Sequence, residues 1–299
     1  MSDANRVAQK RVRFDFEITF SNGGGLQGQD FRLDLDGDDI SDAALADYIT
    51  RDMRLLMVGG VKILRKQIII EPHKRRSPGA GGARFVDLSH AVEHGMTTYK
   101  GLPAPAITDF MTREVSRKSY APGTEFNIAA ISMVANTGTY LDTPFHRYEG
   151  GKDLSQLDLA RVADLQGVVI RALDARAVTP EYFANVDVRG KAVLLHTGWD
   201  RYWRTDAYHV DSPYLTADAA SYLIDQGAAV VGIDSLNIDD TRDTTRPVHS
   251  ALLAAEIPII EHMCNLQALP PQAFRFFAVP VKVRGMGTFP VRAFALLDV

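Results

Sequence analysis

The 299-residue sequence contains a single cysteine, Cys264. One cysteine excludes an intrachain disulfide and any zinc site built from several cysteines, and it fits a reducing cytoplasm. Long apolar runs are also missing, since no stretch approaches the roughly 20 apolar residues that span a bilayer. The first residues, MSDANRVAQKRVRF, have no apolar segment of the signal-peptide kind. We therefore expect neither secretion nor membrane insertion, and a cytoplasmic protein.

Clustered positive charge is scarce as well. The net charge is -4, and the chain has no long run of lysine and arginine, which argues against nucleic acid as a partner because phosphate binding needs concentrated positive charge. Internal repeats and low-complexity segments are also missing. With 46% hydrophobic residues, the chain can bury a core large enough for one large domain, or for one large and one small domain.

A stretch rich in glycine, proline and basic residues, HKRRSPGAGGAR, interrupts the hydrophobic pattern at residues 73–84. We interpret it as a linker. It separates a small N-terminal domain, residues 1–72, from a larger domain, residues 85–299.

The small domain has the pattern of a ββαβ unit. VRFDFEITF and FRLDLDG alternate apolar and polar residues on either side of SNGGGLQGQ, which predicts a β-hairpin. VKILRKQIII predicts a further strand. Between them, Ser41 can cap a helix whose apolar face carries Leu45, Ile49, Met53 and Leu56. No chemistry is assigned to this domain.

The larger domain is rich in apolar runs that are typical of strands buried on at least one face. These runs are GVVIRALD, KAVLLHTGW, AAVVGIDS, FFAVPVKV and VRAFALLDV. Among them, LTADAASYLIDQGA has a candidate cap, Thr216, and the helical spacing of Ala219 and Leu223. The pattern predicts a mixed α/β domain.

Polar residues with strand spacing occur in NTGTYLDTPFH, residues 136–146. If residues 136–142 form a strand, Asn136, Tyr140 and Asp142 point to the same side of it and converge on one cavity. His146 lies just beyond the expected strand end, where a loop can direct its ring into the same cavity.

A second polar group lies far away in the sequence. RPVHSALLAAEIPIIEH places His249 and Glu261 on either side of a short predicted helix and an apolar strand. Together with Asp142 they provide oxygen and nitrogen atoms of the kind that bind a divalent metal ion.

From FVDLSH to the C-terminus, the chain resembles the cyclase family, which contains bacterial kynurenine formamidases and isatin hydrolases. The signature of that family is His-x-Gly-Thr-His-x-Asp-x-Pro-x-His, followed much later by a His and a Glu or Gln twelve residues apart. Asn136 and Tyr140 stand where the signature has histidines. Matching stretches occur in the order DLSHAVEHGMTTYKG, NTGTYLDTPFH, LLHTGWDRYW, VVGIDSLNID and PVHSALLAAEIPIIE. Matching signature positions are Gly138, Thr139, Asp142, Pro144, His146, His249 and Glu261.

The resemblance implies a swivelling β/β/α domain around a mixed, partly closed sheet, and a homo-oligomer, either a dimer or a tetramer. In the family, the strand histidines and the aspartate hold one metal ion, and in binuclear members the aspartate, the late histidine and the glutamate hold a second. An activated water attacks an amide carbonyl, and the last signature histidine shuttles the proton.

Carried over to this chain, the resemblance implies a metal site at Asp142, His249 and Glu261, with His146 as the acid/base. Because Asn136 and Tyr140 replace two imidazoles, we expect at most one divalent ion, zinc or manganese.

Two functions therefore remain open. The first is a hydrolase that cleaves a C–N bond of an amide, formamide or lactam in a small, possibly aromatic substrate through a metal-activated water. The second is a metal-free cyclase, dehydratase, isomerase or small-molecule-binding protein in which Tyr140 and His146 act as an acid/base pair. In both, Asn136, Tyr99 and Trp199 are candidates for contact with a small-molecule substrate.

Overall fold

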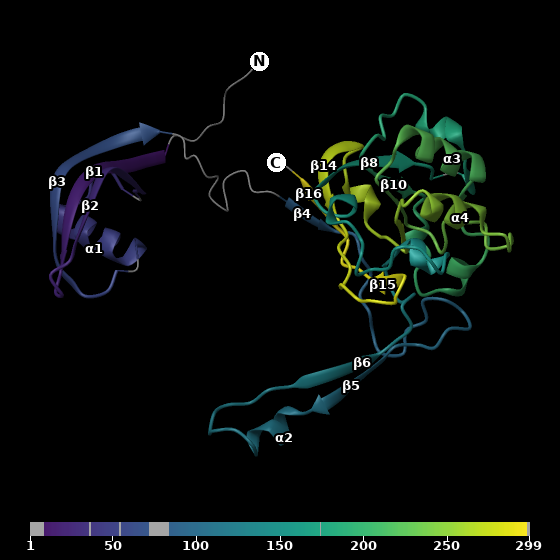
Figure 1. Cartoon of the computed structure of the whole chain (residues 1–299), viewed down its shortest axis with the longest axis horizontal. Helices are drawn as coiled ribbons and strands as arrows, with labels where there is room; N and C mark the ends of the chain where they lie inside the picture. The colour runs from purple at the N-terminus through teal and green to yellow at the C-terminus, as the bar shows by residue number, and fades with distance from the viewer. Residues whose placement is uncertain (1–8, 36, 54, 72–83, 174, 298–299) are drawn as a thin grey trace. The chain divides into compact units, whose positions relative to one another are not determined.

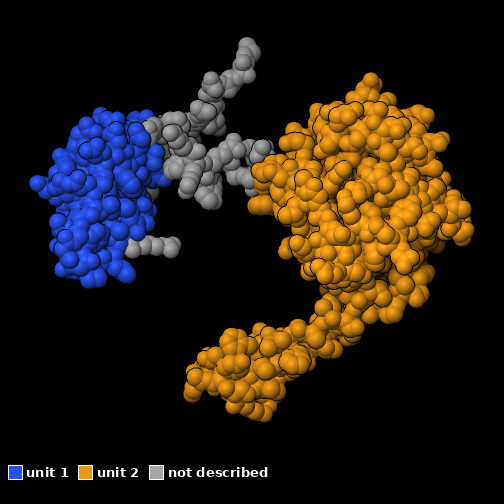
Figure 2. Space-filling model, in the orientation of Figure 1, with its two compact units in different colours: residues 1–82 blue, residues 83–299 orange. Residues whose placement is uncertain are grey.

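The computed structural model describes residues 9–71 and 84–297, apart from residues 36, 54 and 174. The chain divides into two compact units, residues 1–82 and 83–299 (Figure 2). The linker predicted at residues 73–84 lies outside the described residues, except for its last residue.

The first unit is an antiparallel sheet, with strand order β2-β1-β3, packed against one helix. Its elements are β1 (Gln9–Phe20), β2 (Gly25–Asp34), α1 (Asp42–Asp52) and β3 (Val58–Glu71). The period-two alternation of β1 places its apolar side chains, among them Phe14 and Phe16, on the buried face. These side chains pack with Leu45 and Ile49 of α1. The predicted ββαβ unit is confirmed.

Ser41 caps α1 as predicted, because its side chain accepts a hydrogen bond from the backbone amide of Ala44 at 3.2 Å. The prediction that Leu56 belongs to the apolar face of this helix is wrong. The helix ends at Asp52, and Leu56 lies beyond it with 82% of its surface exposed.

The second unit is built on one curled mixed sheet, with strand order β15-β7-β13-β12-β10-β8-β14-β16-β4 (Figure 1). The neighbours from β8 to β13 run parallel, and the pairings outside them are antiparallel. The strands are β4 (Arg84–Asp87), β7 (Tyr140–Asp142), β8 (Leu165–Arg171), β10 (Ala192–His196), β12 (Val230–Ile233), β13 (Ile259–Glu261), β14 (Gln272–Phe277), β15 (Thr288–Pro290) and β16 (Phe294–Leu297). The predicted mixed, partly closed sheet is confirmed.

Both faces of this sheet are buried, which explains the continuous apolar runs in the sequence. Alternate side chains, such as Val193 and Leu195 of β10, pack with the helices α3 (Ala217–Gln226) and α4 (Pro247–Ala254). The intervening ones, such as Leu194, face the concave side and pack with β14 and β16. The part of the sheet that contains β7 and β13 is thus packed against an apolar core on each face.

Helices and short strands complete this unit. Thr216 caps α3 as predicted, accepting from the amide of Ala219 at 3.2 Å. The remaining α-helix and short strands described are α2 (Arg113–Arg117), β5 (Ala106–Met111), β6 (Ile128–Ser132), β9 (Ala177–Val178) and β11 (Tyr214–Leu215). The 3-10 turns are η1 (Pro144–His146), η2 (Leu159–Arg161), η3 (Pro180–Phe183), η4 (Trp199–Tyr202), η5 (Asp206–His209) and η6 (Leu266–Ala268). Along the described residues, no helix combines the length and the apolar composition needed to cross a membrane.

Two strand predictions need correction. The strand expected at 136–142 is formed only by Tyr140–Asp142, because Gly138 adopts a left-handed backbone with φ of 66°, which interrupts the extended conformation before Tyr140. The run FFAVPVKV begins in β14 but leaves it after Phe277, where a proline follows within three residues. The short helix predicted before the apolar strand is present as α4, which contains His249 and ends at Ala254.

An arm that the sequence patterns did not predict is formed by β5, α2 and β6 (Figures 1 and 2). β5 and β6 pair as an antiparallel hairpin. Large apolar side chains of the arm are exposed to solvent, and Phe110 is 76% exposed. The other exposed ones are Ile107, Val115, Tyr120, Phe126, Ile128 and Ile131.

Gly287 lies where two loops of the second unit approach each other closely. Its carbonyl accepts a hydrogen bond from the amide of Thr143 at 2.7 Å. A Cβ atom at Gly287 would lie 2.2 Å from the backbone nitrogen of His146, which is far inside van der Waals contact.

The variant Gly287→Ala should therefore be destabilised by about 1–3 kcal/mol, because the clash is with backbone and not with the end of a flexible side chain. Thermal unfolding measures the effect. Gly150→Ala is the matched control, since nothing lies within 4 Å of its Cβ position. Equal melting temperatures for the two variants would show that the loops separate freely.

Candidate functional site

The candidate site is built on the antiparallel pair β7 and β13. Tyr140 lies directly opposite Glu261 in this pair, and Asp142 lies opposite Ile259. Because side chains two residues apart share a face, Tyr140 and Asp142 point to the side on which Glu261 lies. All three polar side chains are buried.

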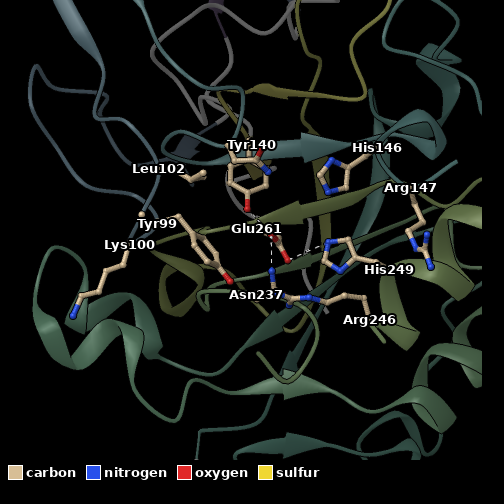
Figure 3. Close-up of a pocket in the computed structure, with 12 residues that line it drawn as sticks. Tyr99, Lys100, Leu102, Tyr140, His146, Arg147, Asn237, Arg246, His249 and Glu261 are labelled. Atoms are coloured by element: carbon tan, nitrogen blue, oxygen red, sulfur yellow. Dashed lines mark hydrogen bonds and ion pairs between the residues drawn. The ribbon is translucent and has the colours of Figure 1, made fainter. Parts of the chain in front are cut away.

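A cavity of about 510 Å³ opens above these strands (Figure 3). Its wall combines aromatic, cationic and amide side chains with two histidines. The lining residues are Tyr99, Lys100, Gly101, Leu102, Asn136, Tyr140, His146, Arg147, Asn237, Arg246, His249 and Glu261.

His249 is the centre of the polar cluster. It lies on α4, and its Nδ1 is 2.6 Å from Oδ2 of Asp239. Its Nε2 lies 3.7 Å from Oδ2 of Asp142 and 3.6 Å from Oε1 of Glu261. A carboxylate on one ring nitrogen fixes the orientation of the other, so Nε2 is directed between two acidic side chains.

The charge of this cluster favours a cation. Burial alone would lower the pKa of His249, but the neighbouring carboxylates of Asp142, Asp239 and Glu261 raise it to about 10. Burial raises the pKa of Glu261, and the negative charge of Asp142 raises it further. One positive charge between these carboxylates offsets their repulsion.

Glu261 is already engaged by hydrogen bonds. The Tyr140 hydroxyl donates to Oε2 at 2.6 Å, and the amide of Ile238 donates to Oε1 at 2.6 Å. Burial raises the pKa of Tyr140 well above its ordinary value, as do the charges of Glu261 and Asp142. Tyr140 is therefore a neutral hydrogen-bond donor at physiological pH.

His146 is held beside Asp142 by Thr288. The Thr288 hydroxyl donates to Oδ1 of Asp142 and lies 2.8 Å from Nδ1 of His146. Since its proton goes to Asp142, the hydroxyl oxygen accepts from His146, which places the ring proton on Nδ1. Nε2 of His146 then keeps its lone pair for a ligand or a proton.

Asp142, His146 and His249 form a group that fits a metal ion, because one ligand atom from each lies within 4.8 Å of the others. Oδ2 of Asp142 is buried and has no hydrogen-bond partner among the described residues, which is costly unless a cation satisfies it. The three residues predicted as ligands, Asp142, His249 and Glu261, are also brought together, but hydrogen bonds occupy the oxygens of Glu261.

Of the three residues predicted to contact the substrate, two line the cavity and one does not. Tyr99 and Asn136 line the cavity, and Asn136 lies beside Tyr140. Trp199 does not line it, so the structure does not support that prediction. Its indole donates to the carbonyl of Tyr208 at 3.0 Å and its ring packs against Tyr202.

Arg246, Asn237 and Asp239 also belong to the site and were missed from the sequence. The Asp239 carboxylate accepts a hydrogen bond from the backbone amide of His249 and also contacts the His249 ring. Arg246 and Asn237 line the cavity. Polar residues in an irregular loop have no periodicity. The available signals were the position of VVGIDSLNID, which contains Asn237 and Asp239, among the stretches resembling the family, and the position of Arg246 directly before PVHSALLAAEIPIIE.

The chain is similar in sequence to known proteins. The chain is 27% identical over 211 residues to a kynurenine formamidase from Geobacillus thermodenitrificans, a match that covers 70% of this chain and 95% of the relative. A kynurenine formamidase from Bacillus cereus is 25% identical over 217 residues, covering 71% and 96%.

Solved structures show the same fold. A potential metal-dependent hydrolase with cyclase activity superposes with a TM-score of 0.60 at 25% identity, covering 73% of this chain and 99% of the other. An isatin hydrolase bound to the product analogue thioisatinate superposes with a TM-score of 0.61 at 20% identity, covering 73% and 93%. Residues 86–240, which are 155 of the 299, match the family described as putative cyclase. The predicted resemblance is therefore confirmed, and the chain belongs to the cyclase family.

Proposed function

We propose that this protein is a metal-dependent hydrolase that cleaves a non-peptide C–N bond of a small aromatic substrate. The observation that carries the proposal is the buried Oδ2 of Asp142, which has no hydrogen-bond partner among the described residues and lies 3.7 Å from Nε2 of His249, a residue that lines the cavity. The kynurenine formamidases among its relatives act on a compound of this class.

Asp142 and His249 would hold the ion, with Glu261 as the third ligand. When bound, a divalent ion supplies Lewis-acid polarisation of a carbonyl and activation of water. Asp239 keeps Nδ1 of His249 protonated and its Nε2 directed inward. We propose at most one zinc or manganese ion per chain.

His146 is placed to move the proton in this reaction. Cleavage of an amide transfers one proton from the attacking water to the departing nitrogen, and Nε2 of His146 has the lone pair to carry it. Tyr99 and Asn136 line the cavity where the aromatic part of the substrate would pack.

The metal-free alternative requires Tyr140 to give or take a proton with His146. Tyr140 is fully buried, its proton is held by Glu261, and its raised pKa disfavours the phenolate. The relatives are also hydrolases. Both observations favour the metal-dependent reaction.

Metal dependence is tested by elemental analysis and by cleavage of formanilide. Protein purified without chelator should contain no more than about one zinc or manganese ion per chain, and EDTA should abolish cleavage. Asp142→Asn should lose both ion and activity, because the amide is a weaker, neutral ligand. Asp225→Asn, an exposed position on α3, is the control.

Two tightly bound ions per chain would show that Asn136 and Tyr140 act as ligands. Cleavage that is indifferent to EDTA and to Asp142→Asn would instead support the metal-free acid/base reaction.

The role of His146 is tested by His146→Ala. Its side chain is 35% exposed, so the melting temperature should change little, while the rate should fall by about 100- to 10,000-fold. Ion content should stay at the level of the parent protein. Loss of the ion in this variant would make His146 a ligand and not the proton carrier, and His209→Ala, outside this cavity, controls for removal of an imidazole.

We also propose that the protein is a homo-oligomer, a dimer or a tetramer. The arm of β5, α2 and β6 exposes a row of large apolar side chains, and such patches on soluble proteins mark interaction surfaces. The arm is continuous with the cavity wall, since Leu102 precedes it and Asn136 follows it. A second copy docked on the arm would therefore lie next to the chain segments that form the cavity wall.

Light scattering coupled to gel filtration tests this proposal. The parent protein should have the mass of a dimer or tetramer, and Phe110→Glu should shift it towards the monomer because the charge would be buried at the interface. Leu159→Glu, an exposed apolar position at 60% exposure away from the arm, should leave the mass unchanged. A monomeric parent protein would refute the proposal.

A small molecule is the proposed substrate, and we propose no nucleic-acid or membrane partner. A cytoplasmic location is proposed from the single cysteine, Cys264, which is free and buried.

A further inference from the structure

Arg246 is a cation in the cavity wall that the reaction described above does not use. It is the residue immediately before α4, the helix that carries His249. Its side chain lines the cavity and lies on the same side as Asn237 and Tyr99 (Figure 3). Nη1 donates to Oδ1 of Asn237 at 2.7 Å, and the guanidinium lies beside Tyr99.

The other cations of the cavity wall are exposed and have partners at the surface. Nζ of Lys100 lies 2.9 Å from a carboxylate oxygen of Asp206. Arg147 donates to Ser250 and lies over the ring of Tyr148. Like Arg147, Arg246 has no carboxylate within 4.0 Å of its guanidinium among the described residues, but Arg246 is partly buried in the cavity wall whereas Arg147 is exposed.

The fixed contacts of Arg246 are neutral. A guanidinium has five N–H donors in a planar fork, and the contacts to Asn237 and Tyr99 orient it without neutralising it. A half-buried cation with free donors is suited to a planar anion, and carboxylates bind such a fork through two parallel hydrogen bonds.

The backbone of Arg246 is unusual for an arginine. It adopts a left-handed conformation with φ of 52° and ψ of 57°, which costs about 1 kcal/mol for a residue with a Cβ atom. Its side chain makes no capping hydrogen bond to α4. The conformation directs the arginine side chain to the cavity wall beside His249, and strained residues of this kind cluster at ligand sites.

We propose that Arg246 binds a carboxylate carried by the substrate and thereby makes the enzyme selective for anionic aromatic amides over neutral ones. This proposal rests on the proposed function for its kinetic test, but not for its binding test. Asn237 and Tyr99 are positioning residues, since they hold the guanidinium and leave its remaining donors facing the cavity.

The kinetic test compares two amides that differ only in charge, 2-formamidobenzoate and formanilide, with the metal-loaded enzyme. Arg246→Gln should lower kcat/KM for 2-formamidobenzoate by about 10- to 100-fold, the usual effect of losing a charged hydrogen-bond partner. For formanilide the change should stay within about twofold. Arg242→Gln is the matched control in the same loop, because its guanidinium pairs with Asp240 at the surface.

The binding test uses 2-aminobenzoate and aniline, measured by calorimetry without turnover. The parent protein should bind 2-aminobenzoate more tightly than aniline, and Arg246→Gln should remove that difference. If it does so while neither formamide is cleaved, the proposed hydrolysis is wrong and the carboxylate site stands.

Three results would overturn the assignment of Arg246. The first is equal binding of 2-aminobenzoate and aniline by the parent protein. The second is an equal loss of kcat/KM for both formamides in Arg246→Gln, which would make Arg246 a support for Tyr99 and Asn237. The third is an unchanged preference for 2-formamidobenzoate in the variant.

Discussion

The packing of three buried carboxylates around one imidazole is the interaction on which the site depends. Asp142, Asp239 and Glu261 surround His249 in a region that water hardly reaches, and bare carboxylates repel strongly in such surroundings. Fixed donors offset most of this charge. They are the Thr288 hydroxyl at Asp142, the amides of Val248 and His249 at Asp239, and the Tyr140 hydroxyl and the Ile238 amide at Glu261. The gap between Asp142 Oδ2 and His249 Nε2 is left for one cation, either a proton or a metal ion.

The fold makes this arrangement possible by fixing the register of a very short strand. β7 contains three residues, yet it is paired on both sides, with β13 and with β15. A slip of one residue would turn Tyr140 and Asp142 to the opposite face. Leu141 points to the opposite side and packs in the core with Ile260, so a slip would also bring polar groups into that core. The apolar core thus determines which side chains reach the cavity.

The sequence predicted what depends on local patterns. The caps at Ser41 and Thr216 and the apolar alternation of the strands follow from short-range chemistry, and the structure confirms them. The family signature identified Asp142, His146, His249 and Glu261. The strand at 136–142 was mispredicted because side-chain alternation does not reveal the left-handed backbone of Gly138.

The arm and the loop residues could not be predicted for a different reason. The arm has exposed apolar residues that resemble core positions in a pattern, and only the folded chain shows that nothing in this unit covers them. Asp239 and Arg246 reach the site through an irregular loop, where the distance between two side chains is set by tertiary packing and not by sequence spacing.

The two replaced signature histidines now have a physical interpretation. Asn136 lies beside the Tyr140 hydroxyl, and Tyr140 donates to Glu261, so Tyr140 stabilises the glutamate directly. The neutral Tyr140 phenol donates a hydrogen bond to Glu261. It thereby stabilises the negative charge of Glu261, which a second metal ion would otherwise do. Because the Ile238 amide occupies the other oxygen, Glu261 needs less from a cation than Asp142, whose Oδ2 has no donor among the described residues. With both signature histidines replaced, the carboxylate oxygen that lacks a donor is therefore Oδ2 of Asp142, beside His249. This charge distribution favours a site with one cation.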